Sequence, residues 1–330
     1  MRRSGGRRID RSAGFFSEKL FGGPARSSGL GAKDPYGIRT ASVRHPYRRT
    51  GSATVRPMTT AVVSPRTASG TAGVGALLRE WRLRRRVSQL DLALRADSSA
   101  RHISFIETGR SRPSQEMVLR LAEHLDVPVR DRNVLLIAAG YAPGFPETPM
   151  DDPSMEALRT GMERLLTGYE PFPALVVDGT YHVVAANRGI RALLAGVGTE
   201  LLEPPLNAMR ITLHPAGLAP RIRNLLEWRE HLLTQMQRQL AVVRSAPLRA
   251  LFEEVSGYPL PAGGRETAGD GGHAPYALPM VIEHDGRVLS FISTIATFNT
   301  PMDVTVSELA LETFLPADQE TADHLRTWLP

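Results

Sequence analysis

The chain contains few groups of residues whose types and spacing could carry out catalysis. The stretch EWREH, at residues 227–231, comes near the inverted zinc motif H-x-x-E-H, in which two histidines on one helix face hold a metal ion. Glu227, however, stands where the first histidine ligand would have to be. We therefore expect this stretch to be the solvated face of a helix whose other face belongs to the core.

A second polar group, Glu283, His284 and Asp285, could be taken for a catalytic triad. Asp285 is followed by glycine, a pair that marks a tight turn between two strands, so we expect these side chains to meet water. The sequence also lacks G-x-S-x-G, a Walker A loop and H-E-x-x-H. The Gly-rich stretch 261–275 lacks G-x-G-x-x-G, so it is not expected to hold phosphate. We expect no catalytic residue, no metal site and no cofactor.

Arginines near residue 100 indicate a different chemistry. Arg101, Arg110 and Arg112 fall within the stretch SSARHISFIETGRSR, and guanidinium groups bind phosphates and pair with guanine. Ile103 and Ile106 lie three residues apart, which places both on the inner side of a short helix. The stretch could therefore be either an ordinary amphipathic helix or a helix that contacts DNA.

The residues before this stretch favour the second interpretation. Ser88 is a typical N-cap for a helix through Arg95, and Asp97 follows where a turn is needed. Ala93 is small enough for the closest crossing of two helices, and Ser99 is a typical cap for the second one. A helix-turn-helix needs two short helices, a tight turn and an inward apolar pair that fixes the second helix, and this sequence supplies all three.

Five short helices are expected between residues 71 and 140, which makes a compact all-α unit. The first ends near Val87, the third is stopped by Gly109, and the fifth runs from Asp131 to Ala139. Residues 141–154 contain four prolines and predict a semi-stiff linker.

The remaining residues, 155–330, predict an α+β domain. Its expected elements are a helix at 155–166, a hairpin at 173–187, helices at 188–195 and 219–243, a hairpin at 280–298, a strand leading into a helix at 303–314, and a last helix reaching Trp328.

The charge is unevenly distributed along the chain. Residues 1–70 carry a net charge of +11, residues 71–140 carry +4, and residues 141–330 carry −9. A polyanion such as DNA is therefore expected to bind the N-terminal part of the chain, within residues 1–140. Residues 1–70 show no sustained periodicity and predict a disordered basic extension, with a transit peptide or a DNA-binding arm as alternatives.

The chain has no cysteine, which fits the reducing cytoplasm. No apolar run is long enough to span a membrane, so no membrane partner is expected.

Residues 73–139 closely resemble the phage-repressor-like (XRE-type) helix-turn-helix family. The residues that carry the resemblance are Ser88-Gln89, Leu92-Ala93, Ser99, Ile103-Ser104, Ile106-Glu107, Gly109, Pro113, Leu121-Ala122, Leu125 and Val127.

The resemblance implies which residues meet double-stranded DNA. Gln89 would bond a phosphate and help to orient the reading helix, and Arg110 and Arg112 would contact phosphates. Arg101 could pair with guanine, and Phe105 could touch a thymine methyl group. The expected DNA-binding residues are Gln89, Ser99, Ala100, Arg101, His102, Ser104, Phe105, Arg110 and Arg112.

From Glu170 onward the chain resembles the ligand-binding domain of MmyB-like transcription regulators. The resemblance rests on EPFPALVVDGTYHVVAANRG, LLEPPLNAMRITLHPAGLAPRIRNLLEWREHLL and STIATFNTPMDVTVSELALETFLPAD. It implies a PAS-like α/β fold and a small apolar ligand of fatty-acid type. The expected fold class is thus an all-α five-helix helix-turn-helix domain followed by an α+β PAS-like domain.

A PAS-like domain encloses a mostly apolar cavity between a curved sheet and its covering helices. Arg221, or alternatively Arg223, could hold a carboxylate head group near a helix start. The expected ligand-binding residues are Met209, Leu213, Arg221, Leu225, Trp228, Leu232, Phe291 and Phe298.

These observations predict a cytoplasmic, ligand-responsive transcription regulator that binds a two-fold operator as a homodimer. Two alternatives remain open at this point. The C-terminal domain could serve only to dimerise the protein, or the chain could be an enzyme that acts on a lipid.

Overall fold

The computed structural model describes residues 73–260 and 277–329. The predicted disordered extension at 1–70 and the predicted Gly-rich loop at 261–275 therefore lie outside the described residues.

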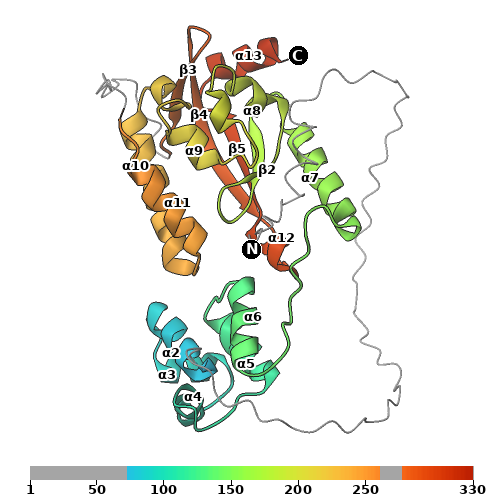
Figure 1. The fold of residues 1–330 in the computed structure, drawn as a ribbon, viewed down its shortest axis with the longest axis vertical. Coiled ribbons are helices and arrows are strands. Elements are labelled where there is room, and N and C mark those ends of the chain that lie inside the picture. The colour runs from blue at the N-terminus through green and yellow to red at the C-terminus, as the bar shows by residue number, and fades with distance from the viewer. Residues whose placement is uncertain (1–72, 261–276, 330) are drawn as a thin grey trace, which may run out of the picture. The chain divides into compact units, whose positions relative to one another are not determined.

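Five helices make up residues 74–138, and the predicted all-α fold class of this unit is confirmed (Figure 1). Ser88, Ser99 and Ser114 each accept a hydrogen bond from a backbone N–H three residues further on, at 3.0, 3.1 and 3.2 Å. These caps fix where three of the helices begin. The helices are α2 Val74–Arg84, α3 Gln89–Arg95, α4 Ala100–Glu107, α5 Gln115–His124 and α6 Val129–Ala138.

All five helices contribute to the core of this unit, and one part of it lies where α2, α3 and α4 meet. Trp81, Leu92, Ile103 and Ile106 are all buried there, so the inward isoleucine pair holds α4 in place. Gly75 lets α2 approach the end of α4, because a Cβ at this position would lie only 2.2 Å from the carbonyl oxygen of Ile106. The depth of this contact depends on a glycine in the first turn of α2.

The C-terminal domain combines a five-stranded antiparallel sheet with several helices, which confirms the predicted α+β PAS-like class. Its strands are β1 Ala174–Val177, β2 Val183–Ala186, β3 Met280–His284, β4 Arg287–Thr297 and β5 Ala310–Pro316. Its longer helices are α7 Glu156–Gly168, α10 Leu225–Val242, α11 Ala246–Ser256 and α13 Gln319–Trp328. Its short helices are η1 Pro153–Met155, α8 Arg188–Leu193, η2 Thr199–Leu201, α9 Ala208–Leu213, η3 Ala219–Arg221 and α12 Val304–Glu308.

The strand order β2-β1-β5-β4-β3 places the last strand in the middle of the sheet. Leu175 of β1 and Ile295 of β4 both pair with Glu312 of β5, so β5 bridges segments far apart in the sequence. One face of the sheet packs on α7 through Met162 and Leu166. The other face supports the larger core with α8, α9, α10 and α11, and α7 and α10 lie on opposite sides of the sheet in Figure 1.

The predicted order of elements at 303–314 is wrong, because the short helix α12 comes first and the strand β5 follows. Asp303 caps α12 by accepting a hydrogen bond from the Val306 N–H at 3.3 Å. Residues 310–316 then pair on both sides, with β1 and with β4, and this pairing holds them extended. A local helical pattern here was overridden by long-range strand pairing.

The helix expected at 219–243 is divided into η3 and α10, and α9 and α11 form where no helix was expected. Among the described residues, no helix is long and apolar enough to cross a membrane.

Candidate DNA-binding surface and ligand cavity

The turn between α3 and α4 is built as the sequence pattern requires. Asp97 adopts a left-handed backbone with φ of 49°, and the Ser98 N–H donates to the Ala93 carbonyl at 2.9 Å. Short polar side chains such as aspartate tolerate this conformation better than branched ones do. After α4, Gly109 also takes a positive φ, of 72°, and ends the helix.

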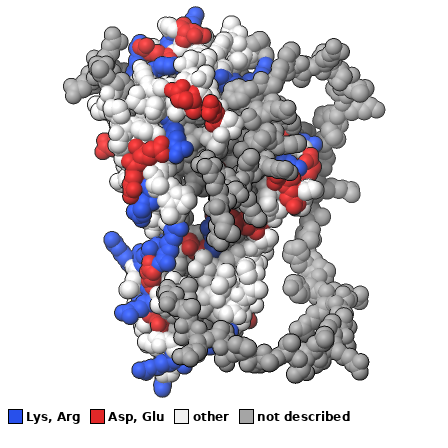
Figure 2. Space-filling view, viewed as in Figure 1, with Lys and Arg blue, Asp and Glu red and all other residues white. Residues whose placement is uncertain are grey.

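The outward side of α4 carries the residues expected to contact DNA. Arg101 and Arg110 are exposed, while Ala100, Ser104 and Phe105 are half-buried. Ile103 and Ile106 face the core on the opposite side. In Figure 2, basic side chains stand out along the edge formed by α2, α3 and α4. This placement leaves the arginines open to a polyanion.

Phe105 gathers two of these arginines around one aromatic ring. The guanidinium carbon of Arg101 lies 5.2 Å from the centre of the Phe105 ring, and that of Arg110 lies 5.9 Å from it. Each cation–π contact at such an exposed site contributes about 0.5–1 kcal/mol. The ring therefore orients two positive charges on the same side of α4.

Gln89 has a partner inside the protein. Its amide nitrogen Nε2 donates to Oε2 of Glu107 at 2.8 Å, and Glu107 also forms a two-pronged ion pair with Arg82 at 2.6 and 2.8 Å. Burial by itself would raise the pKa of Glu107, but the hydrogen bonds from Arg82 and Gln89 outweigh it and lower that pKa. Glu107 is thus ionised and holds Gln89 at the start of α3. The pattern of the family contains Glu107, but its partner Arg82 could not be found from spacing alone.

Three other expected DNA-binding residues also have partners within the unit. Arg112 donates from Nε and Nη2 to the Ala139 carbonyl at 3.2 and 3.0 Å, and it lies over the Tyr141 ring. The His102 Nδ1 lies 3.2 Å from the Ser98 hydroxyl. The Ser99 hydroxyl caps α4. Arg112 is exposed like Arg101 and Arg110, but its guanidinium group is bound to a backbone carbonyl, whereas theirs lie against the Phe105 ring.

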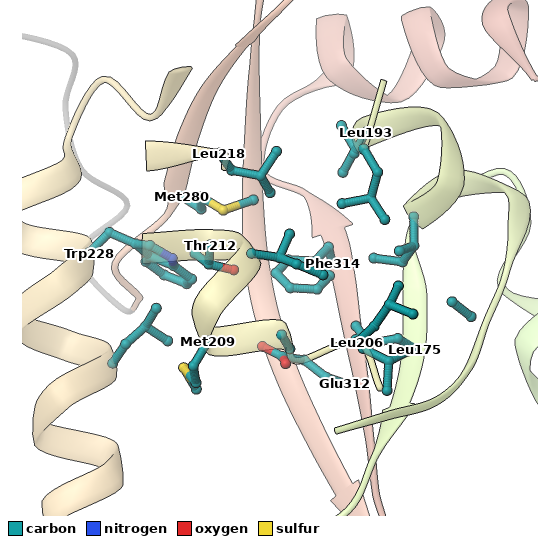
Figure 3. A pocket seen from close by; sticks show the side chains of 17 residues that line it. Leu175, Leu193, Leu206, Met209, Thr212, Leu218, Trp228, Met280, Glu312 and Phe314 are labelled. Atoms are coloured by element: carbon teal, nitrogen blue, oxygen red, sulfur yellow. The ribbon is translucent and has the colours of Figure 1, made fainter. Parts of the chain in front are cut away.

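The C-terminal domain encloses an apolar cavity of about 70 Å³ between the sheet and its covering helices. This exceeds the ~10–15 Å³ that a single water molecule requires. Leu175 and Phe314 form the sheet side, while Met209 and Trp228 reach in from α9 and α10 (Figure 3). Thr212 and Glu312 are the polar residues of the lining; the others are Val183, Ala186, Ile190, Leu193, Leu194, Leu206, Ala208, Ile211, Leu218, Leu232 and Met280.

Three of the residues expected to bind the ligand line this cavity: Met209, Trp228 and Leu232. Five do not, and the reason differs between them. Leu213, Leu225 and Phe291 are packed in the core, and Phe298 lines a separate depression of about 90 Å³ on the other side of the sheet. The sequence analysis did not include Glu312 and Phe314, although their spacing of two residues along one strand places both on the same face.

Arg221 does not reach the cavity because its donors are used elsewhere. It donates to the carbonyls of Glu283, Leu193 and Ala195 at 3.0, 2.9 and 3.0 Å, and to Nδ1 of His284. It therefore ties β3 to the end of α8, and we see no donor directed toward a ligand. The alternative, Arg223, forms an ion pair with the Glu283 side chain at 2.6 Å.

His284 is buried rather than exposed at the turn. The strand β3 alternates, so Met280, Ile282 and His284 all face inward, and the His284 ring lies 4.4 Å from that of Trp328. Since a guanidinium can only donate, Nδ1 of His284 accepts from Arg221 and the neutral ring carries its proton on Nε2. Burial, together with the positive charge of Arg221, lowers the pKa of His284. In the stretch EWREH, by contrast, Glu230 and His231 are exposed as expected, and Trp228 faces the core.

This lowered pKa predicts acid sensitivity of the C-terminal domain. As pH falls below the ordinary histidine value of 6.5, the unfolded chain takes up the proton before the folded domain does, so stability declines. In His284→Asn the amide oxygen can accept from Arg221 without titrating. We expect the melting temperature of this variant to fall less than that of the wild type between about pH 7 and pH 5. His231→Asn, on the exposed face of α10, is the control; an equal fall in all three proteins would contradict the prediction.

Comparison with known proteins places both parts of the chain. The model of the MmyB-like transcription regulator ligand binding domain matches residues 158–327, just over half of the chain, and a helix-turn-helix model matches residues 78–131. A solved structure described as the clp gene regulator ClgR from Corynebacterium glutamicum is 27% identical over 30% of this chain and 90% of that chain, with a TM-score of 0.18. Among proteins of curated function, none matches.

The two matched regions coincide with the surface and the cavity described above. A helix-turn-helix unit with exposed arginines is linked to a domain of a regulator family, so the protein is a DNA-binding transcription regulator. The chain belongs to the family of the MmyB-like transcription regulator ligand-binding domain, joined here to a helix-turn-helix unit.

Proposed function

We propose that this protein is a cytoplasmic transcription regulator whose affinity for an operator depends on a small apolar ligand in the C-terminal domain. The observation that supports the proposal is an apolar cavity between sheet and helices in a domain linked to a helix-turn-helix unit. An alkyl chain of fatty-acid type suits a lining of leucines, Met209 and Trp228.

The DNA-binding step is assigned to α4. Its outward side would enter the major groove, where Arg101 pairs with a base and Arg110 contacts phosphate. One such module buries little DNA surface, so a homodimer on a two-fold operator would supply the required affinity. Ligand binding would change the placement of the two DNA-binding units relative to each other. It shifts DNA affinity only if the ligand binds the two arrangements unequally.

A two-stage experiment tests both halves of the proposal. Selection from a random duplex pool with the full chain is expected to enrich one palindromic site. An organic extract is then expected to change the affinity for that site, and native mass spectrometry is expected to show a bound small molecule. Ala208→Leu, which fills part of the cavity, should lose the response and keep DNA binding, whereas Ala250→Leu on the exposed side of α11 should behave as wild type.

The two halves fail separately. If no sequence is enriched, the proposal that α4 contacts bases in the major groove is wrong. If a site is found but neither extract nor Ala208→Leu changes anything, the cavity has no sensing role and the domain serves another purpose, such as dimerisation.

A further inference from the structure

A single charged side chain, that of Glu312, stands among the 17 residues that line the cavity. Its carboxyl group points from β5 into the space between the sheet and α9 (Figure 3). Thr212 is the other polar residue of the lining, and no arginine, lysine or histidine is part of it. A ligand that fills the cavity must therefore meet a carboxyl group.

The position of Glu312 follows from the register of the sheet. Glu312 pairs with Leu175 of β1, and Leu175 and Phe314, which lies two residues further along β5, both line the cavity on the same face. Ser293 of β4 donates from its hydroxyl to Oε1 of Glu312 at 2.8 Å. This hydrogen bond orients the carboxyl group and uses one of its acceptor sites, so acceptor capacity remains for a ligand.

The surroundings make an ionised Glu312 unfavourable without a further partner. Burial raises the pKa of Glu312, and the hydrogen bond from Ser293 only partly opposes it. Burial and the nearby Glu312 charge also raise the pKa of Tyr181 to about 12. A carboxylate in apolar surroundings is stabilised by a donor or a cation and destabilised by a second negative charge.

We propose that the cavity selects an apolar ligand whose head group donates a hydrogen bond to Glu312, a primary alkylamine being the simplest example, and that it rejects a free carboxylate. This inference rests on the proposed function, since it requires the cavity to be a ligand site. The proposed ligand keeps the apolar chain of the expected fatty acid but carries a hydrogen-bond donor in place of the carboxylate. The arginine that would have held a carboxylate, Arg221, is bound to β3 and α8 instead.

Three probes that share one chain test the choice of head group. Octylamine, octan-1-ol and octanoate are titrated into the full-length protein by calorimetry at neutral pH. Octylamine is expected to bind about tenfold or more tightly than octanoate, because its ammonium group pairs with an ionised Glu312, whereas octanoate can bind only if one of the two facing carboxyl groups takes up a proton. Octanol, which also donates but is neutral, is expected to lie between the two.

Glu312→Gln keeps the size of the side chain and removes its charge. In this variant the preference for octylamine over octanoate is expected to fall to about threefold or less. Ser293→Ala, which removes the orienting hydrogen bond, should reduce the preference less. Glu253→Gln removes the same charge from the exposed side of α11 and should leave the preference unchanged. Thermal melts monitored by circular dichroism establish that each variant is folded.

The outcomes separate this inference from the proposed function. Equal or tighter binding of octanoate to the wild type, or an unchanged preference in Glu312→Gln, would overturn the role of Glu312 while leaving the cavity as a ligand site. If none of the three probes binds, the sensing function itself fails and the inference falls with it.

Discussion

Glu107→Ala is expected to lower the free energy of unfolding of the helix-turn-helix unit by about 3–5 kcal/mol. The variant leaves the Arg82 guanidinium, which is 7% exposed, with the Val87 carbonyl as its remaining partner, at 2.9 Å. A buried charge that loses its counter-ion keeps its desolvation penalty without compensation. Gln89 would also lose the acceptor that positions it at the start of α3.

Hydrogen exchange of peptides from α2 and α4 measures this loss in the full-length protein. The control is Glu116→Ala, since Glu116 is 80% exposed and pairs with Arg120 one turn along α5. That surface pair should contribute only about 0.3–0.5 kcal/mol. The double variant Arg82→Met, Glu107→Leu should recover most of the stability, because it removes both buried charges. A loss below about 1 kcal/mol in Glu107→Ala would show that water reaches the ion pair.

The pH dependence gives an independent check of the same ion pair. Because the folded pKa of Glu107 is lowered, its contribution is fully present above the ordinary glutamate value of 4.5 and is lost as pH falls through the folded pKa. Acid unfolding of the wild-type unit should therefore be steeper below that value than acid unfolding of the double variant.

Arg101→Ala is expected to lower affinity for the selected operator by about 1–3 kcal/mol, or roughly 5- to 150-fold. Arg101 is exposed on the outward side of α4 and lies over the Phe105 ring, which limits its conformations before DNA is bound. A guanidinium held in this way can form two hydrogen bonds to one guanine. Arg101→Lys should lose nearly as much specificity, because lysine keeps the positive charge but lacks the planar guanidinium whose two N–H donors can bind one guanine.

Titrations on the operator and on random duplex DNA distinguish the two possible contacts. A base contact predicts a loss on the operator that is much larger than the loss on random DNA. An equal loss of affinity on both DNAs would mean that Arg101 contacts a phosphate instead. The slope of the logarithm of the binding constant against the logarithm of the salt concentration would then also fall by about one. Arg164→Ala removes the same charge from an exposed position on α7 and should change neither affinity.

The helix-turn-helix could be predicted from sequence because its determinants are local. Ser88 and Ser99 cap helices through contacts three residues away, and Ile103 and Ile106 face inward because of helical periodicity. Each of these signals lies within one turn of the residue it affects. The same locality explains why the outward position of Arg101 could be inferred without coordinates.

The cavity could not be assembled in this way, because its walls come from β1, β2, β3, β5, α8, α9 and α10. Leu175 and Glu312 are 137 positions apart in the sequence and become neighbours only through strand pairing. Aromatic and leucine residues near these elements could equally belong to the core, and Leu213, Leu225 and Phe291 do.

By itself the sequence determined the two-part architecture and the helix that presents its arginines, since both depend on short-range periodicity and capping. Only the tertiary structure decided that residues 310–316 form the central strand, that Arg221 bonds β3 and α8, and that Glu312 faces the cavity. The physical reason is the range of the interactions. A hydrogen bond within a helix is set by its neighbours, whereas strand register and cavity lining depend on segments that meet only when the whole domain has folded.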